Sequence, residues 1–169
     1  MSNINADLTY ILRFVGPTDV ENPEGVFATL SGYGEPIRGE PKNVTSPESQ
    51  SWKLFPIEGK EDVYKIYSTR WPILPFAIQD PPPIFPSWGL SGEVPTGNHD
   101  LVLLKVCETK WRIKQADGGQ GHTISPVKTD GRVGVDYYVD FDERTRMLYI
   151  KTIPVILDPP PAPKWELIC

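Results

Sequence analysis

Several residue types are scarce in this 169-residue chain, and each shortage excludes a class of protein. Only two cysteines are present, Cys107 and Cys169, whereas a small domain stapled by disulfides needs more. The two cysteines are 62 residues apart and the only two histidines, His99 and His122, are 23 apart, spacings that match no common zinc-binding pattern. We therefore expect neither a disulfide framework nor a metal site.

Positive charge and long apolar runs are scarce as well. Lys and Arg number 17 against 22 Asp and Glu, and no cluster exceeds two adjacent basic residues, whereas a nucleic-acid binder normally carries a basic face. No apolar run approaches the roughly 18 residues that indicate a membrane-spanning helix. The N-terminal residues lack the basic and apolar regions of a secretory signal. We expect no nucleic-acid or membrane partner, and a protein that is cytoplasmic or released without a conventional signal peptide.

Signatures of catalysis are missing too. The sequence contains no nucleophile elbow and no Cys-His signature. The glycine-rich stretch 118–121 lies between two expected strands, where a hairpin turn fits better than a phosphate-binding loop. The acidic residues Asp140, Asp142 and Glu143 lack the spacing of a calcium-binding loop. We expect no enzyme, no catalytic residue and no cofactor.

What the chain has is proline, glycine and a hydrophobic core. The 19 prolines and 14 glycines disfavour helix interiors, so a helical bundle is excluded. The 39% hydrophobic and 11% aromatic residues exclude a disordered proline-rich chain. The length suits one domain, residues 1–169.

Short segments in which apolar and polar residues alternate, separated by Pro, Gly and Asp turns, predict an all-β protein with about twelve strands. The alternation between 101 and 115 favours strands there over a helix. The predicted strands are 8–15, 26–31, 35–40, 51–57, 62–68, 75–79, 101–107, 110–115, 121–128, 132–140, 147–154 and 163–168.

An internal repeat indicates how these strands are arranged. A Trp-x-Leu/Ile segment occurs three times, as Trp52-Lys53-Leu54, Trp111-Arg112-Ile113 and Trp165-Glu166-Leu167. Tyr10, Tyr64 and His122 then occupy equivalent positions. Three repeats of about 55 residues with four strands each predict a β-trefoil, a closed six-stranded barrel capped by three hairpins. A β-sandwich with coincidental tryptophan spacing is the alternative.

A carbohydrate-binding function is one alternative for such a fold. Many trefoil lectins carry Gln-x-Trp in each repeat, and Gln50-Ser51-Trp52 fits once. The equivalent positions read Thr109-Lys110-Trp111 and Pro163-Lys164-Trp165, so the motif is absent from two repeats.

Residues 27–41, FATLSGYGEPIRGEP, carry a family resemblance, supported by the segments around Tyr10, Trp52 and Tyr64 and by 148–155. The sequence resembles the mycocypins, the clitocypin- and macrocypin-like fungal inhibitors of cysteine proteases. The resemblance implies a β-trefoil that inhibits papain-like cysteine proteases reversibly and without a covalent bond. It covers nearly the whole chain, with 80–145 matched poorly.

The resemblance also implies which loops occlude the protease cleft. Loop 1 is 16–25 with the residue that follows it, and its implied contact residues are Asn22, Pro23, Glu24, Gly25 and Val26. Loop 2 is 42–50, and its implied contact residues are Thr45, Ser46, Pro47, Glu48 and Ser49. Prolines in these loops fix φ and so lower the entropy lost on binding.

A further loop implied by the resemblance, loop 3 (68–75), inhibits a second protease class. Its implied residues here are Thr69, Arg70, Trp71 and Pro72. Many family members place an Asn in this loop and inhibit legumain; loop 3 has none, so we do not expect legumain inhibition. Arg70 would instead enter the acidic specificity pocket of a trypsin-like serine protease.

Overall fold

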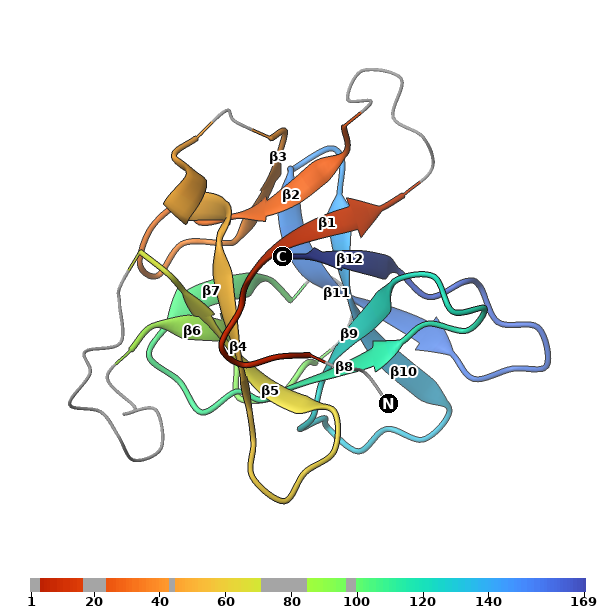
Figure 1. The fold of residues 1–169 in the computed structure, drawn as a ribbon. Coiled ribbons are helices and arrows are strands. Elements are labelled where there is room, and N and C mark those ends of the chain that lie inside the picture. Colours follow the sequence, from red (N-terminus) through yellow and green to blue (C-terminus); the bar gives the residue numbers. More distant parts are fainter. Residues whose placement is uncertain (1–3, 17–23, 43–44, 71–84, 97–99) are drawn as a thin grey trace.

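Twelve strands and one short 3₁₀ helix make up the described part of the chain. The structure is a computed structural model that describes residues 4–16, 24–42, 45–70, 85–96 and 100–169 (Figure 1). The predicted strand at 75–79 lies outside these ranges. The sixth strand observed is instead β6 (Ser87–Leu90), which the sequence did not predict. Every other predicted strand overlaps an observed one.

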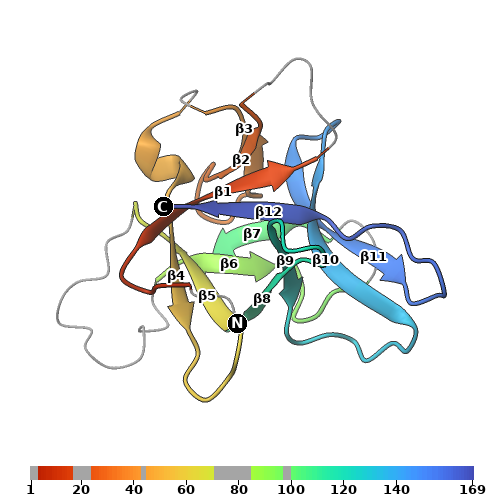
Figure 2. The ribbon, with the colours of Figure 1, turned by 45° about the vertical axis from the view of Figure 1, so that its right-hand side comes forward.

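Six strands close into a barrel. They are β1 (Thr9–Val15), β4 (Trp52–Pro56), β5 (Val63–Ser68), β8 (Trp111–Gln115), β9 (His122–Pro126) and β12 (Lys164–Ile168). Each pairs antiparallel with the next in this order, and β12 pairs with β1 to complete the ring (Figure 2). Because the ring is closed, none of these six strands presents a free edge for aggregation.

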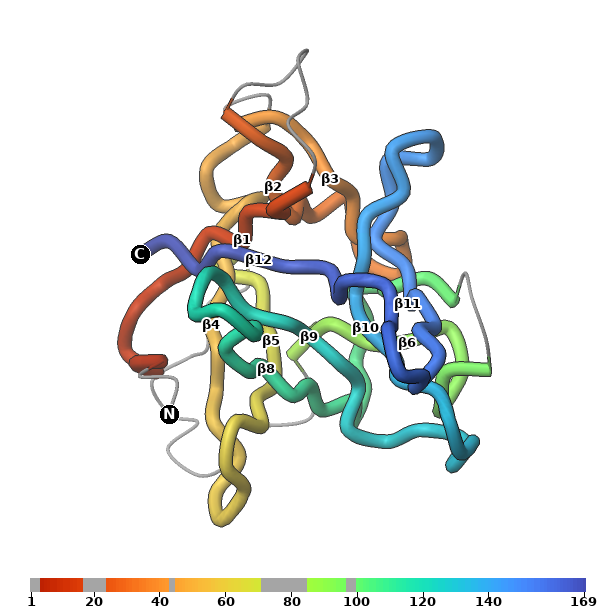
Figure 3. The backbone as a smooth tube through the Cα atoms, turned by 90° about the vertical axis from the view of Figure 1, so that its right-hand side faces the viewer, coloured from red at the N-terminus to blue at the C-terminus, as the bar shows by residue number. Residues whose placement is uncertain are grey.

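Three hairpins cover one end of this barrel. They are β2–β3 (Val26–Thr29, Arg38–Glu40), β6–β7 (β7 is Val102–Lys105) and β10–β11 (Val135–Asp142, Met147–Pro154). Neighbouring hairpins are joined by the pairs Arg38–Met147, Pro36–Leu103 and Leu101–Tyr149. The β10–β11 hairpin is the longest and extends beyond the others (Figure 3). A barrel of six strands with a triangular cap of three hairpins is a β-trefoil, as the repeat predicted.

The equivalence between the three repeats holds residue by residue at the barrel. In each repeat the predicted equivalent residue of the first strand faces the repeat's tryptophan across the ladder, as Tyr10–Trp52, Tyr64–Trp111 and His122–Trp165. Burial lowers the pKa of His122, an effect that nearby Asp62 partly opposes. His122 therefore stays neutral near pH 7 and occupies a position that tyrosine fills in the other two repeats.

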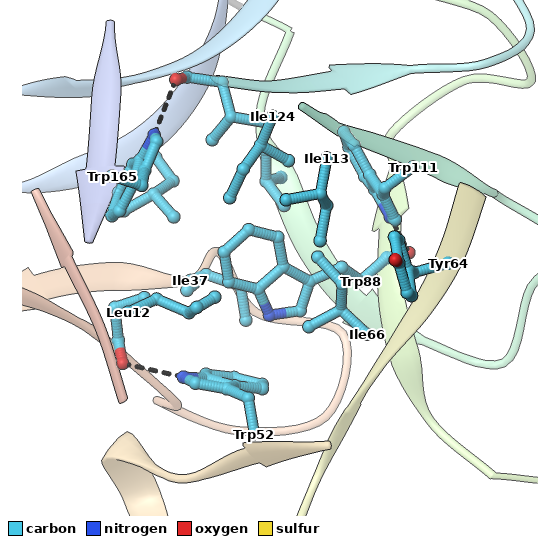
Figure 4. Packing of buried hydrophobic residues seen from close by; sticks show 14 of the residues in the cluster. Leu12, Ile37, Trp52, Tyr64, Ile66, Trp88, Trp111, Ile113, Ile124 and Trp165 are labelled. Atoms are coloured by element: carbon cyan, nitrogen blue, oxygen red, sulfur yellow. Dashed lines mark hydrogen bonds between the residues drawn. The ribbon is translucent and has the colours of Figure 1, made fainter. Parts of the chain in front are cut away.

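The three tryptophans tie the barrel to the cap (Figure 4). Each indole N–H, fully buried, donates to a backbone carbonyl of its own repeat's second strand: Trp52 to Ala28 (3.0 Å), Trp111 to Trp88 (2.9 Å) and Trp165 to Val139 (3.0 Å). A buried indole needs such an acceptor, since an unpaired buried donor costs about 1–3 kcal/mol.

Trp88 breaks this threefold pattern. It occupies the position that Ala28 and Val139 occupy in the other repeats, and its ring packs edge-on against Trp52 (5.3 Å between centroids) and Trp111 (6.1 Å). Its own indole nitrogen is buried and has no hydrogen-bond partner within the described structure. A large ring therefore fills the centre of the core without a polar anchor of its own.

The contrast between Trp52 and Trp88 predicts different costs for the same substitution. Trp52→Phe removes the donor to the Ala28 carbonyl, whereas Trp88→Phe removes a donor that has no acceptor. Since both changes remove similar ring volume, Trp52→Phe should lower the free energy of unfolding by about 1–2 kcal/mol more than Trp88→Phe. Urea denaturation of both variants measures this difference, and equal losses would contradict the assigned role of the indole bond.

Candidate functional site

The described ends of loop 1 and the helix of loop 2 lie on the same side of the molecule. In Figure 1 the end of β1, the start of β2 and the helix η1 (Pro47–Gln50) lie in the upper part of the view, whereas the turn between β4 and β5 lies at the bottom. Asn22 and Pro23 lie outside the described residues. The other implied contact residues of the two loops are described, and they divide into exposed and buried groups.

Loop 1 re-enters the barrel through a constrained glycine. Gly25 has φ +89°, a conformation that favours glycine, and a β-carbon there would lie 3.1 Å from Arg13 Cδ. Arg13 forms an ion pair with Glu166 of β12, so the arginine is held against the loop. Glu24 is exposed, whereas Val26 is 5% exposed and belongs to the core. Glu24 is thus exposed at the end of loop 1, and Val26 anchors that end in the core.

Loop 2 ends in the helix η1, whose exposed face is short. Ser46, Pro47 and Glu48 are exposed, Thr45 is half-buried and Ser49 is buried. The Ser49 hydroxyl lies 3.0 Å from that of Ser46, and its carbonyl accepts a hydrogen bond from the Leu30 amide at 2.7 Å. The presented part of loop 2 is therefore the segment 46–48, and Ser49 fastens it to the chain after β2.

Gln50 is the strongest anchor of loop 2, and sequence reasoning did not select it for this role. Its side chain, 4% exposed, donates through Nε2 to Thr29 Oγ1 (3.0 Å) and to the Pro41 carbonyl (3.0 Å). Thr29 Oγ1 donates in turn to the Phe27 carbonyl at 2.8 Å. The available sequence signal was Thr29 within the family-like segment 27–41, but only the fold shows that it bonds to Gln50.

Strand β2 thus holds both loops. It follows directly from loop 1 at Val26, and through Thr29 and the adjoining Leu30 it binds the end of loop 2. The strand is itself fixed by the bond from Trp52 to Ala28. A displacement of the end of loop 1 at Val26 or of the end of loop 2 at Ser49 and Gln50 would therefore require movement of a buried strand.

Loop 3 begins beside the end of loop 2. The backbone amide and the hydroxyl of Thr69 both donate to the Ser51 carbonyl, each at 3.2 Å. The Arg70 amide donates to Ser68 Oγ at 3.2 Å, and the Arg70 side chain is exposed. Trp71 and Pro72 lie outside the described residues.

The described residues offer no sign of metal chemistry. Within those ranges no three His, Cys, Asp or Glu side chains are grouped so that they could hold a metal ion. The same part of the chain includes no helix with the length and apolar character needed to cross a membrane.

Comparison with known proteins gives one family and several neighbours in fold. The profile of the family described as "Peptidase inhibitor clitocypin" matches residues 9–167. No curated protein sequence matches the chain significantly.

Solved structures resemble the chain in fold alone. A designed threefold-symmetric protein, ThreeFoil, is 12% identical with a TM-score of 0.59, covering 95% of this chain and 98% of its own. The Rhizoctonia solani agglutinin is 16% identical with a TM-score of 0.59, covering 95% and 93%. A mosquitocidal holotoxin is 12% identical with a TM-score of 0.62, covering 98% of this chain and 17% of the toxin.

The Gln50 anchor predicts a measurable loss of stability. Gln50→Leu preserves most of the side-chain volume but removes both hydrogen bonds, so the free energy of unfolding should fall by about 1–3 kcal/mol. The control is Gln115→Leu, since Gln115 is exposed and bonds only the nearby Gly119 carbonyl; it should change stability by less than about 0.5 kcal/mol.

Urea denaturation measures both variants, and hydrogen exchange at the Leu30 amide reports whether loop 2 has loosened. If Gln50→Leu is no worse than the control and Leu30 stays protected, Gln50 does not anchor loop 2.

Proposed function

The chain belongs to the clitocypin family of peptidase inhibitors, and on this premise we propose that it inhibits papain-like cysteine proteases reversibly by placing loops 1 and 2 in the protease cleft. As a member of an inhibitor family, the protein is a peptidase inhibitor and not an enzyme. The observation that carries the proposal for these two loops is their common attachment to the buried strand β2.

Rigidity supports this use of the loops. Association loses translational and rotational freedom and the freedom of any loop that becomes ordered, so loops held in one conformation bind more tightly. Loop 2 is held by Gln50, Ser49 and a helical turn that begins at Pro47, and the end of loop 1 is held against Arg13. Two such loops filling a cleft would bury on the order of 800 Å² per partner, the size of a standard protease–inhibitor interface.

The shape of loop 2 also accounts for inhibition without cleavage. A protease accepts a scissile segment in an extended conformation, but Pro47–Gln50 form a 3₁₀ helix. Proline at 47 has no N–H to donate to the cleft. In this arrangement loop 2 occupies the cleft and offers no peptide bond in productive geometry, so the complex is non-covalent and reversible.

The arrangement of the Gln-x-Trp match does not support the carbohydrate-binding alternative. The one Gln-x-Trp match places Gln50 in the interior, bonded to Thr29 and Pro41, where it cannot reach a sugar. The likeness to an agglutinin is one of fold.

Gly25 provides the test of loop 1. Gly25→Val imposes a β-branched side chain on a positive φ and against Arg13, so it should displace the end of loop 1 and raise the inhibition constant for papain at least tenfold. Gly34→Val is the matched control, because Gly34 has φ +76° in a turn outside the loops with open space around it. It carries a similar backbone strain and should leave the inhibition constant within about twofold.

Titration of active papain at equilibrium measures both variants. No inhibition of papain by the unmodified protein at micromolar concentration would refute the proposed target, and equal affinities of the two variants would remove loop 1 from the interface.

We further propose that Arg70 of loop 3 inhibits a trypsin-like serine protease. The support is chemical: Arg70 is exposed directly after the bonds that fix Thr69 to Ser51, and a guanidinium pairs well with the aspartate of a trypsin-type specificity pocket. Arg70→Ala should weaken trypsin inhibition at least a hundredfold while papain inhibition stays within about twofold. Arg144→Ala, at the exposed turn between β10 and β11, is the control and should change neither. Trypsin inhibition that is absent, or unaffected by Arg70→Ala, would refute this role.

A further inference from the structure

Lysines from four separate segments surround one open cavity of about 650 Å³. Lys60 lies in the turn between β4 and β5, Lys105 ends β7, Lys110 precedes β8, and Lys128 follows β9. No two of these residues are adjacent in sequence, and Lys60 is 45 residues from the next, which is why no basic cluster is visible there. A cavity of this size is typical of sites for small molecules.

The cavity has a surplus of positive charge. Its two carboxylates already have lysine partners: Glu93 lies 3.5 Å from Lys128, and Glu108 lies 3.1 Å from Lys65. The Lys65 side chain is only 7% exposed, so it supports Glu108 from behind the cavity wall. Among the described residues no carboxylate is within ion-pair distance of the other three lysines, Lys60, Lys105 and Lys110.

Packing holds one of these lysines in place. A β-carbon at Gly89 of β6 would lie 3.0 Å from Lys105 Cε and 2.6 Å from Cys107 Sγ, so both side chains lie directly on the glycine. The Cys107 thiol donates to the Trp88 carbonyl at 3.6 Å. Lys105 and Lys110 are both half-buried. Both lysines line the same cavity, so an anion bound there would lie close to two positive side chains.

We propose that this cavity binds a small molecule through a phosphate or sulfate monoester group. Lysine is an effective point-charge partner for such groups, and Ser91 and Thr109, whose side chains can donate hydrogen bonds, line the same cavity. The surplus charge is local, because the chain as a whole carries a net charge of −5. The proposal does not depend on loops 1 and 2, because none of their described residues lines the cavity. The turn between β4 and β5, to which Lys60 belongs, lies at the bottom of Figure 1, away from the helix η1.

Titration with three matched sugars tests the chemistry. Glucose 6-phosphate, glucose 6-sulfate and glucose are added to ¹⁵N-labelled protein up to about 20 mM at low salt, where charge interactions are least screened. We expect saturable shifts of amides near the cavity with both esters and none with glucose. The phosphate ester should bind more tightly near pH 7, where it carries close to two charges. Equal shifts with glucose, or no saturable shifts with either ester, would overturn the proposal.

Charge-matched variants test the site. The double variant Lys105→Gln with Lys110→Gln should weaken binding of glucose 6-phosphate at least tenfold, and Lys60→Gln alone, in an exposed turn, several-fold. The control is Lys53→Gln with Lys164→Gln, which removes the same charge away from the cavity and should leave affinity within about twofold. Circular dichroism and the melting temperature confirm that each variant is folded. Equal weakening by the control would show that binding depends only on the net charge of the protein, and this result would refute a defined site.

Discussion

The bond from each repeat's buried tryptophan to a carbonyl of its second strand is the interaction on which the rest of the structure depends. The donors of these bonds, Trp52, Trp111 and Trp165, belong to barrel strands, and the acceptor carbonyls belong to the hairpins of the cap. Each bond therefore joins the barrel to the cap. The indole ring supplies apolar area to the core, and its N–H requires an acceptor in a fixed direction. The same tryptophan thereby fills the core and fixes the position of the cap hairpin relative to the barrel.

The attachment of loops 1 and 2 follows from this constraint. Trp52 fixes β2 through Ala28, and β2 in turn supports loop 2 through Thr29 and Leu30 and continues directly from loop 1. A clitocypin-family inhibitor needs loops that keep their shape when a protease cleft closes on them, since ordering a flexible loop subtracts from affinity. The barrel therefore supplies a fixed base, and the 3₁₀ turn at Pro47–Gln50 holds the end of loop 2 against it.

The barrel architecture also brings positive charge together at one cavity. The chain is acidic overall, yet the turns at the ends of β4, β7 and β9 and the segment before β8 bring lysines to one cavity. Strand ends from different repeats meet around a barrel regardless of their separation in sequence. A trefoil can therefore gather lysines from separate segments at one cavity without placing any of them in the core.

The sequence by itself determined the all-β class, the threefold repeat and the equivalence of Tyr10, Tyr64 and His122, because barrel strands alternate between core and solvent and this alternation is present in each local segment. That each of these residues pairs with its repeat's tryptophan came from the structure. It did not determine β6, where all four residues are buried and no alternation remains, nor the central place of Trp88. It located loops 1 and 2, but not that Val26 and Ser49 face inward while Glu24 and Glu48 face out. The Gln50–Thr29 bond and the lysine cavity were decided only by tertiary structure, because each depends on contacts between segments that the chain separates and the closed barrel brings together.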